Sequence, residues 1–195
     1  MSVRVPAAPA DERVWLRRAV TVLAAPGEVF AGLRDDSDAA ARARSEAVLA
    51  LVLLSGIASV LWTPTYGRLL DDVANDGLNV AVIAFIGGGI YGTTVYYLGG
   101  LVLQWLTRAF GGVTYRQTRH VLAFASAPIA LSLFVVWPLR LAVYGEDVFR
   151  SGGSDQGAGN AAFYAIELAF VAWALALLAV GLRTLLRRQP RFKRL

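Results

Sequence analysis

The amino-acid sequence predicts an all-α fold: a polytopic helical membrane protein with about four transmembrane helices, preceded by short amphipathic interfacial helices. Hydrophobic residues make up 56% and charged residues 17% of the 195 residues, and the mean hydropathy is +0.53. An ordinary soluble domain of this length is less apolar. Apolar runs long enough to cross a bilayer alternate with polar turns, and the basic residues gather on one side of these runs.

The composition also excludes several kinds of chemistry. The chain holds no cysteine and one histidine, so it cannot build a disulfide frame, a reactive thiol or a Cys/His metal site by itself. Ser126 and Ser132 have no histidine or lysine base within plausible reach, so neither is interpreted as a nucleophile. We therefore predict no catalytic, metal-binding or cofactor-binding residue and no enzyme activity.

The segment before the first span is predicted to lie on the cytoplasmic side. Residues 1–10, rich in Pro and Ala, predict a disordered leader, and residues 11–44 predict amphipathic helices. The apolar positions at helical spacing are Trp15, Ala19, Val22 and Leu23 in one helix and Val29, Phe30 and Leu33 in a second helix that starts at Pro26. These helices either cover the cytoplasmic end of the bundle or present a surface for a partner.

The transmembrane domain is predicted over residues 45–188, with its first span over residues 46–62. Trp62 is typical of the membrane interface, and Thr63 and Pro64 end the helix. Asp38 is expected to cap a helix that runs into this span.

The second span is predicted over residues 78–107, within a run of 31 uncharged residues. A continuous helix of this length measures about 46 Å, against a hydrocarbon core of roughly 30 Å. It must therefore tilt, protrude or break, with residues 87–89, all glycine, as the weak point. Gly88 and Gly92 form a GxxxG pair, and Gly99 falls on roughly the same face. Close helix packing and an unwound, pore-lining segment are the two interpretations.

A polar turn separates the second span from the third, which is predicted over residues 118–141. Thr114 and Gln117 have the spacing of a capping box, so the third helix is expected to start at Tyr115. Pro128 within it is expected to produce a kink, and Pro138 to repeat the effect near the outer end.

The fourth span is predicted over residues 161–183, after a flexible loop at 144–160, and is followed by a basic tail at 189–195. Glu167 is the only acidic or basic residue in the interior of a predicted span. Arg140, just past the membrane part of the third span at residues 121–139, is its expected partner. This intramembrane polar pair is interpreted as a structural ion pair or a protonated, hydrogen-bonded acid, with proton or ion handling as the alternative.

The distribution of basic residues predicts the orientation. Of the 19 lysines and arginines, sixteen fall before the first span, in the turn after the second, or after the fourth; three fall in the other two loops. By the positive-inside rule both termini are expected in the cytoplasm, in a multi-pass protein of the cell inner (plasma) membrane.

The stretch at 110–128, FGGVTYRQTRHVLAFASAP, resembles the signature of the Yip domain family: Phe-Gly-Gly, a short turn, Tyr-x-Gln-Thr and an apolar helix with a proline. The matching residues are Phe110, Gly111, Gly112, Tyr115, Gln117, Thr118 and Pro128. Residues 26–33 resemble the family's short element before its first span, and residues 181–183 the end of its fourth. The resemblance covers residues 26 to about 188. The family typically has a fifth span, which is not expected here.

Yip domain proteins are small multi-pass membrane proteins named for interaction with Ypt/Rab GTPases in eukaryotes. The resemblance therefore implies a role in trafficking or membrane organisation. Of the basic residues only Lys193 is a lysine, which is typical of a GC-rich bacterial genome, and in a bacterial member no Rab partner is expected.

These observations together predict a non-enzymatic membrane protein with an organising or protein-interaction role. The expected partners are membrane lipids, including anionic headgroups, a protein at the cytoplasmic face, and other copies in a homo-oligomer; no nucleic acid is expected. Arg116 and Arg119 are the candidate contacts for a partner or for headgroups. The alternative function is a small oligomeric transporter or channel that uses Glu167 and Arg140.

Overall fold

The computed structural model describes residues 14–111, 113–155 and 157–187, and these residues form helices and turns without a β-strand. The predicted leader at 1–10, the tail at 189–195 and Gly112 lie outside the described residues. The elements are α1 (Val14–Ala24), α2 (Pro26–Gly32), α3 (Asp38–Arg42), α4 (Ser45–Leu61), η1 (Tyr66–Asp71), α5 (Gly77–Thr94), η2 (Val95–Gly99), α6 (Gly100–Thr107), α7 (Tyr115–Ala125), α8 (Ala127–Tyr144), η3 (Gly145–Phe149) and α9 (Ala158–Leu186).

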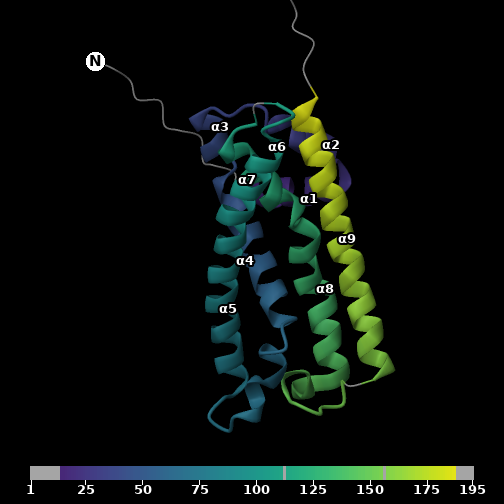
Figure 1. Ribbon diagram of the computed structural model, residues 1–195. Helices are drawn as coiled ribbons and strands as arrows, with labels where there is room; N and C mark the ends of the chain where they lie inside the picture. Colours follow the sequence, from purple (N-terminus) through teal and green to yellow (C-terminus); the bar gives the residue numbers. More distant parts are fainter. Residues whose placement is uncertain (1–13, 112, 156, 188–195) are drawn as a thin grey trace, which may run out of the picture.

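The long helices form a bundle in which α4, α5, the α7–α8 pair and α9 run along a common axis (Figure 1). We call the end that holds α1, α2, α3 and the turn between α6 and α7 the near end, at the top of the figure. The opposite end, which holds η1 and η3, is the far end. Connections between consecutive long helices alternate between the two ends, so the topology is up-and-down.

Three helical stretches among the described residues are long and apolar enough to cross a membrane. They are Gly77–Thr107, Tyr115–Phe149 and Ala158–Leu186, and the shorter apolar helix α4 has 17 residues. The predicted fold class, a helical membrane protein with about four spans, is therefore confirmed. Buried residues make up 56% of the most apolar window of Tyr115–Phe149 but 22% of the windows in the other two stretches. The α7–α8 pair is thus the central element, and α5–α6 and α9 are peripheral.

The helix expected to run from Asp38 into the first span is instead two helices. Ser37 is the N-cap of α3, since its side-chain oxygen accepts the N–H of Ala40, and Asp38 is the first helical residue. α3 ends after five residues and α4 begins at Ser45. Between them the buried Arg44 donates to the carbonyl oxygens of Gly32 and Asp35, which hold the chain in this bend.

The predicted weak point at residues 87–89 is not a break, because α5 continues through these glycines to Thr94. The irregularity begins at Val95, six residues after Gly89, where η2 forms a π-helical turn before α6 continues the helix. Single π-helical turns of this kind are often found at functional sites. The side chains that hold it belong to the site described below.

The two prolines of the third span act differently from each other. α7 ends at Ala125 and α8 begins at Ala127, so the chain breaks at Ser126 and Pro128 occupies the first turn of a new helix, where it needs no hydrogen-bond partner. Pro138, expected to repeat the kink, lies inside α8, which runs on to Tyr144.

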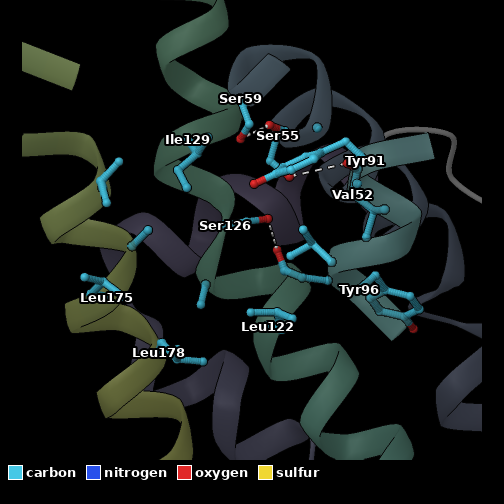
Figure 2. Close-up of a pocket in the computed structure, with 17 residues that line it drawn as sticks. Val52, Ser55, Ser59, Tyr91, Tyr96, Leu122, Ser126, Ile129, Leu175 and Leu178 are labelled. Atoms are coloured by element: carbon cyan, nitrogen blue, oxygen red, sulfur yellow. Dashed lines mark hydrogen bonds between the residues drawn. The ribbon is translucent and has the colours of Figure 1, made fainter. Parts of the chain in front are cut away.

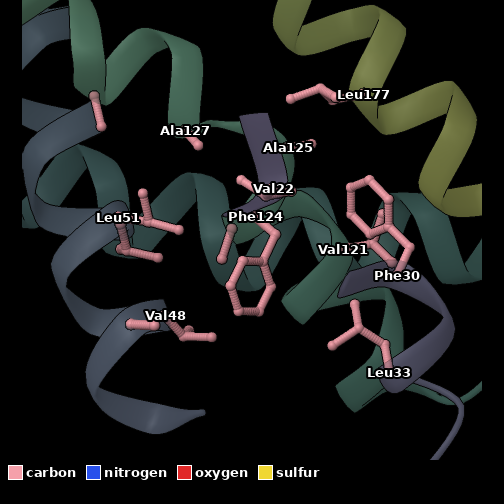
Figure 3. Close-up of a cluster of buried hydrophobic side chains, with 14 residues drawn as sticks. Val22, Phe30, Leu33, Val48, Leu51, Val121, Phe124, Ala125, Ala127 and Leu177 are labelled. Atoms are coloured by element: carbon pink, nitrogen blue, oxygen red, sulfur yellow. The ribbon is translucent and has the colours of Figure 1, made fainter. Parts of the chain in front are cut away.

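The main hydrophobic core lies at the near end and contains the amphipathic helices (Figure 3). Val22 of α1 and Phe30 of α2 are fully buried, together with Val121 and Phe124 of α7 and Leu177 of α9. Burying an aliphatic or aromatic side chain of this size contributes about 1.5–3 kcal/mol. α1 and α2 therefore close the near end of the bundle with the face that the apolar spacing predicted.

Candidate functional site

The polar turn that carries the family-like motif folds back on the near end. Gly111 adopts a φ of 148°, a backbone conformation that residues other than glycine rarely adopt. Thr114 then caps α7: its side chain accepts the N–H of Gln117, and the Gln117 side chain accepts the N–H of Thr114. The predicted capping box and helix start at Tyr115 are both confirmed.

Arg116 joins this turn to the segment before α3. Its guanidinium donates to the Asp36 carboxylate at 2.8 Å, to the Asp38 carboxylate at 2.6 Å and to the Asp36 carbonyl oxygen at 2.7 Å. The Thr114 hydroxyl donates to the second Asp36 oxygen at 2.7 Å. All three guanidinium nitrogens are engaged, as a planar fork allows.

Gln117 extends the same junction toward α2 and α9. Its amide nitrogen donates to the carbonyl oxygen of Leu33 at 3.1 Å, just past the end of α2. The neighbouring Arg34 donates to the carbonyl oxygen of Thr184 at 2.6 Å and so caps the last turn of α9. One glutamine and one arginine therefore link three helix ends.

On the other face of α7, two hydroxyls contact the π-helical region. The Tyr115 hydroxyl donates to the carbonyl oxygen of Tyr97, and the buried Thr118 hydroxyl to that of Gly100, each at 2.9 Å. α7 is thus held between the α2–α3 connection and the π-helical turn by contacts of six residues: Asp36, Thr114, Tyr115, Arg116, Gln117 and Thr118.

Arg119 packs against three tyrosine rings. Its guanidinium carbon lies 4.5 Å from the ring centroid of Tyr115, 4.9 Å from that of Tyr97 and 5.1 Å from that of Tyr96. Its stem lies on Gly100, where a Cβ would collide with the Arg119 side chain. Such cation–π contacts contribute about 0.5–2 kcal/mol each.

Arg116 and Arg119 are the candidate contacts for a partner or for headgroups, and that role stays a prediction. Both side chains are engaged within the chain, by carboxylates in one case and by tyrosine rings in the other. Among the described motif residues, Phe110 has an exposed side chain, with 72% of its surface accessible. Asp36 and the Tyr96–Tyr97 pair were not predicted as site residues. The sequence signal that could have identified Asp36 is the acidic run at residues 35–38 before the first span, because such a run can pair with an arginine of the motif.

Glycines form the contact between α4 and α5. A Cβ on Gly88 would lie 2.6 Å from the backbone of Ile57, and one on Gly92 would collide with the carbonyl oxygen of Val52. Gly56 of α4, which was not predicted, faces both glycines of α5. Gly99, expected on roughly the same face, instead faces Leu122 of α7, because the π-helical turn changes the register of the side chains after residue 94.

The far end holds a second polar cluster, around Arg140. Its guanidinium donates to the Asp155 carboxylate at 2.8 Å and to the side-chain oxygen of Asn160 at 3.1 Å. The guanidinium carbon lies 4.6 Å from the ring centroid of Trp62 and 5.3 Å from that of Trp137. The predicted partner Glu167 is not the partner found, since Asp155 in the far-end loop supplies the carboxylate.

Glu167 is buried between α8 and α9 and pairs with a hydroxyl. Its Oε1 accepts from Ser132 at 3.0 Å, whereas its Oε2 is buried without a hydrogen-bond partner. The buried indole nitrogen of Trp62 lies near the Glu167 carboxyl group, outside hydrogen-bond geometry.

An apolar cavity of about 180 Å³ is lined by side chains of α4, α5, η2, α7, α8 and α9 (Figure 2). The serine hydroxyls on its wall, those of Ser55, Ser59 and Ser126, each donate to a backbone carbonyl oxygen three or four residues earlier. The cavity therefore offers an apolar surface, suited to a hydrocarbon chain. Within the described ranges no group of three or more His, Asp or Glu side chains is placed to hold a metal ion.

The fold and both polar clusters define a helical membrane protein whose polar side chains mainly tie helices together. The family model of the Yip1 domain matches residues 20–194, nearly the whole chain. The chain belongs to the Yip1 domain family. No curated protein and no solved structure matches the chain.

Proposed function

We propose that this chain works without catalysis, as a membrane-embedded interaction protein that organises other membrane components. The observation that carries the proposal is the outer face of α5–α6. It is apolar and has exposed residues along the whole stretch Gly77–Thr107, including the large aromatic residues Phe85 and Trp105. Exposed aromatic side chains are the usual anchors of a protein contact.

The near end supplies a second surface. Arg42, Arg108, Arg183 and Arg187 are exposed there, beside the exposed ring of Phe110. Arginines at the ends of membrane helices attract anionic headgroups, each contributing about 1 kcal/mol. Sixteen of the 19 basic residues fall before the first span, in the turn after the second span or after the fourth, so the positive-inside rule supports a cytoplasmic near end.

Photo-crosslinking in native membranes tests the lateral surface. A photoreactive phenylalanine analogue is placed at Phe85 or at Trp105, and for comparison at Phe134, which is equally exposed but lies on α8. We expect protein adducts from Phe85 and Trp105 and lipid adducts alone from Phe134. Two differently tagged copies of the chain distinguish a homo-oligomer from another protein. Lipid adducts alone at all three positions, or the same protein adducts at all three, would contradict the proposal.

Two features behind the transport alternative, an ion pair between Arg140 and Glu167 and a helix break at residues 87–89, are not found in the described structure. Arg140 is paired with Asp155 instead of Glu167, and the helix is continuous through residues 87–89. We therefore expect no ion or proton flux in reconstituted liposomes, and no difference between the wild type and Glu167→Gln. A flux that Glu167→Gln abolishes would restore the transport interpretation.

A further inference from the structure

The far-end loops hold few basic residues, and all of them meet at one place. Of the 19 basic residues, Arg68, Arg140 and Arg150 are the three that fall in far-end segments. All three line a single polar cavity of about 240 Å³, although Arg68 follows α4, Arg140 belongs to α8 and Arg150 follows η3. Three arginines from separate elements do not gather for reasons of topology, because a basic residue on the far side works against the charge asymmetry.

Most acidic residues of the same loops do not line this cavity. Of the six, Asp155 alone lines the cavity. Asp71 accepts the N–H of Ser151, Asp76 caps α5 through the N–H of Asn79, and Glu146 forms an exposed ion pair with Arg150 at 3.5 Å. The far-end loops are acidic as a whole, and yet this cavity has an excess of positive charge.

Arg140 is the buried arginine of the cavity. Its side chain is 6% exposed and is held by Asp155 and by the aromatic rings of Trp62, Trp137 and Tyr164. Its Nη2 makes both hydrogen bonds, whereas its buried Nε has no hydrogen-bond partner. The charge of this guanidinium is thus fixed in place and only partly satisfied by the protein.

The two other arginines of the cavity, Arg68 and Arg150, are exposed. Arg150 donates to the carbonyl oxygen of Leu70 through Nη1, and its exposed ion pair with Glu146 contributes little in water. The Arg68 side chain is exposed and makes no hydrogen bond or ion pair with another described residue, although the charges of Arg68 and Arg150 both act on the nearby Asp71 carboxylate. The Arg68 guanidinium and the exposed part of Arg150 are therefore available to a ligand.

We propose that this cavity binds a phosphate-bearing anion, supplied either by a phospholipid headgroup of the adjacent leaflet or by a free phosphate. Guanidinium groups bind phosphate oxygens in pairs of parallel hydrogen bonds, which is the strongest polar recognition available to these side chains. Trp62 and Tyr164, which line the same cavity, are side chains typical of the headgroup level of a bilayer.

The test uses the full chain purified in detergent and the double variant Arg68→Ala with Arg150→Ala. Arg140 stays in place because it supports the fold. Inorganic phosphate is titrated by calorimetry, and phosphatidylglycerol retained by the protein is measured by native mass spectrometry. The control variant is Arg17→Ala, which removes an exposed arginine of α1 that belongs neither to this cavity nor to the near-end surface described above. We expect the double variant to bind at least tenfold more weakly and the control to bind as the wild type does.

The calorimetry and the mass spectrometry distinguish the two sources of the phosphate group. Retained phosphatidylglycerol without a phosphate signal identifies the headgroup, and a phosphate signal without retained lipid identifies the free anion. Absence of both in the wild type, or equal binding in the double variant, overturns the proposal. If the double variant does not fold, Arg68→Ala alone decides, because the Arg68 side chain makes no hydrogen bond within the described structure.

Discussion

The Tyr115 hydroxyl donates a hydrogen bond of 2.9 Å to the carbonyl oxygen of Tyr97, within the π-helical turn of the second span. Three residues further along α7, Thr118 makes the equivalent contact with Gly100. The Tyr-x-Gln-Thr part of the motif thus has a structural meaning: its tyrosine and threonine hold the irregular turn, and its glutamine faces the opposite way, toward α2.

Tyr115→Phe removes this hydrogen bond and keeps the ring that lies under Arg119. We expect the free energy of unfolding to fall by about 1 kcal/mol. Denaturant unfolding in detergent micelles measures the change. Tyr97→Phe is the matched control, because it keeps the accepting carbonyl oxygen and the ring near Arg119. Equal losses in the two variants would show that the hydroxyl of Tyr115 does not hold the turn.

Arg116→Ala should free the segment at residues 35–38 from α7, because the guanidinium bridges the Asp36 and Asp38 carboxylates. We expect faster cleavage of this acidic segment by a protease specific for Asp and Glu. Since the pair is partly exposed, high salt should produce a similar effect in the wild type. Arg42→Ala, an exposed arginine of α3, should leave the cleavage rate unchanged. An unchanged rate in Arg116→Ala would contradict the bridge.

Gly92→Ala should separate α4 from α5, because the added methyl group collides with the carbonyl oxygen of Val52. The expected loss is about 1–3 kcal/mol in the free energy of unfolding, the usual cost of overpacking. Gly89→Ala is the control, since its Cβ would lie 3.7 Å from a methyl group of Leu53, an ordinary contact. We expect it to be neutral or slightly stabilising, and a loss as large as that of Gly92→Ala would contradict the packing argument.

The sequence predicted those features that depend on short-range patterns. Hydrophobic periodicity placed Phe30 and Leu33 on the buried face of α2, and the capping box placed the start of α7. Both signals lie within a few residues of the structure that they determine. The GxxxG spacing likewise marked Gly88 and Gly92, whose close approach to α4 needs nothing more than small residues one turn apart.

The sequence could not predict features that depend on contacts between distant segments. The π-helical turn has no local signal, since it is held by Tyr115, 18 residues from its partner Tyr97. Similarly, Asp155 belongs to a glycine-rich loop that resembled a flexible linker, and only the fold brings its carboxylate to Arg140. The sequence therefore indicated Glu167 as the nearest plausible carboxylate for Arg140, whereas the fold supplies that of Asp155.

Acidic pH should loosen the contact between η1 and the loop after η3. Hydrogen bonding by Ser151, through its side chain and its backbone N–H, lowers the pKa of Asp71 below its ordinary value of 3.8. A depressed pKa means that the contribution is complete above the unfolded value and is lost as the pH falls through the folded value. We expect faster hydrogen exchange around Ser151, corrected for the intrinsic rate, as the pH drops below 3.8.

Asp71→Asn should remove this pH dependence. Asp72→Asn is the control, because Asp72 accepts the N–H of Ala74 within its own loop. A profile for Asp71→Asn that still follows the wild type would assign the acid sensitivity to another group.

Asp155→Ala should be among the most damaging single changes at the far end, because it leaves the buried Arg140 without its carboxylate. Their side chains are 10% and 6% exposed. Removing one partner of a buried ion pair typically costs about 3–5 kcal/mol, since the remaining charge stays desolvated. Glu146→Ala breaks an ion pair too, but one in which both side chains are exposed, so we expect a loss of at most about 1 kcal/mol.

Replacing Arg140 and Asp155 together, by Met and Leu, distinguishes the charge from the packing. Apolar pairs of similar volume often replace a buried ion pair without loss, so the double variant should regain much of the stability that Asp155→Ala loses. It should regain less than all of it, because the guanidinium also lies 4.6 Å from the ring centroid of Trp62. Chemical unfolding of the three variants in the same micelles measures both terms. If the double variant is no more stable than Asp155→Ala, the uncompensated charge of Arg140 is not what makes the single change costly.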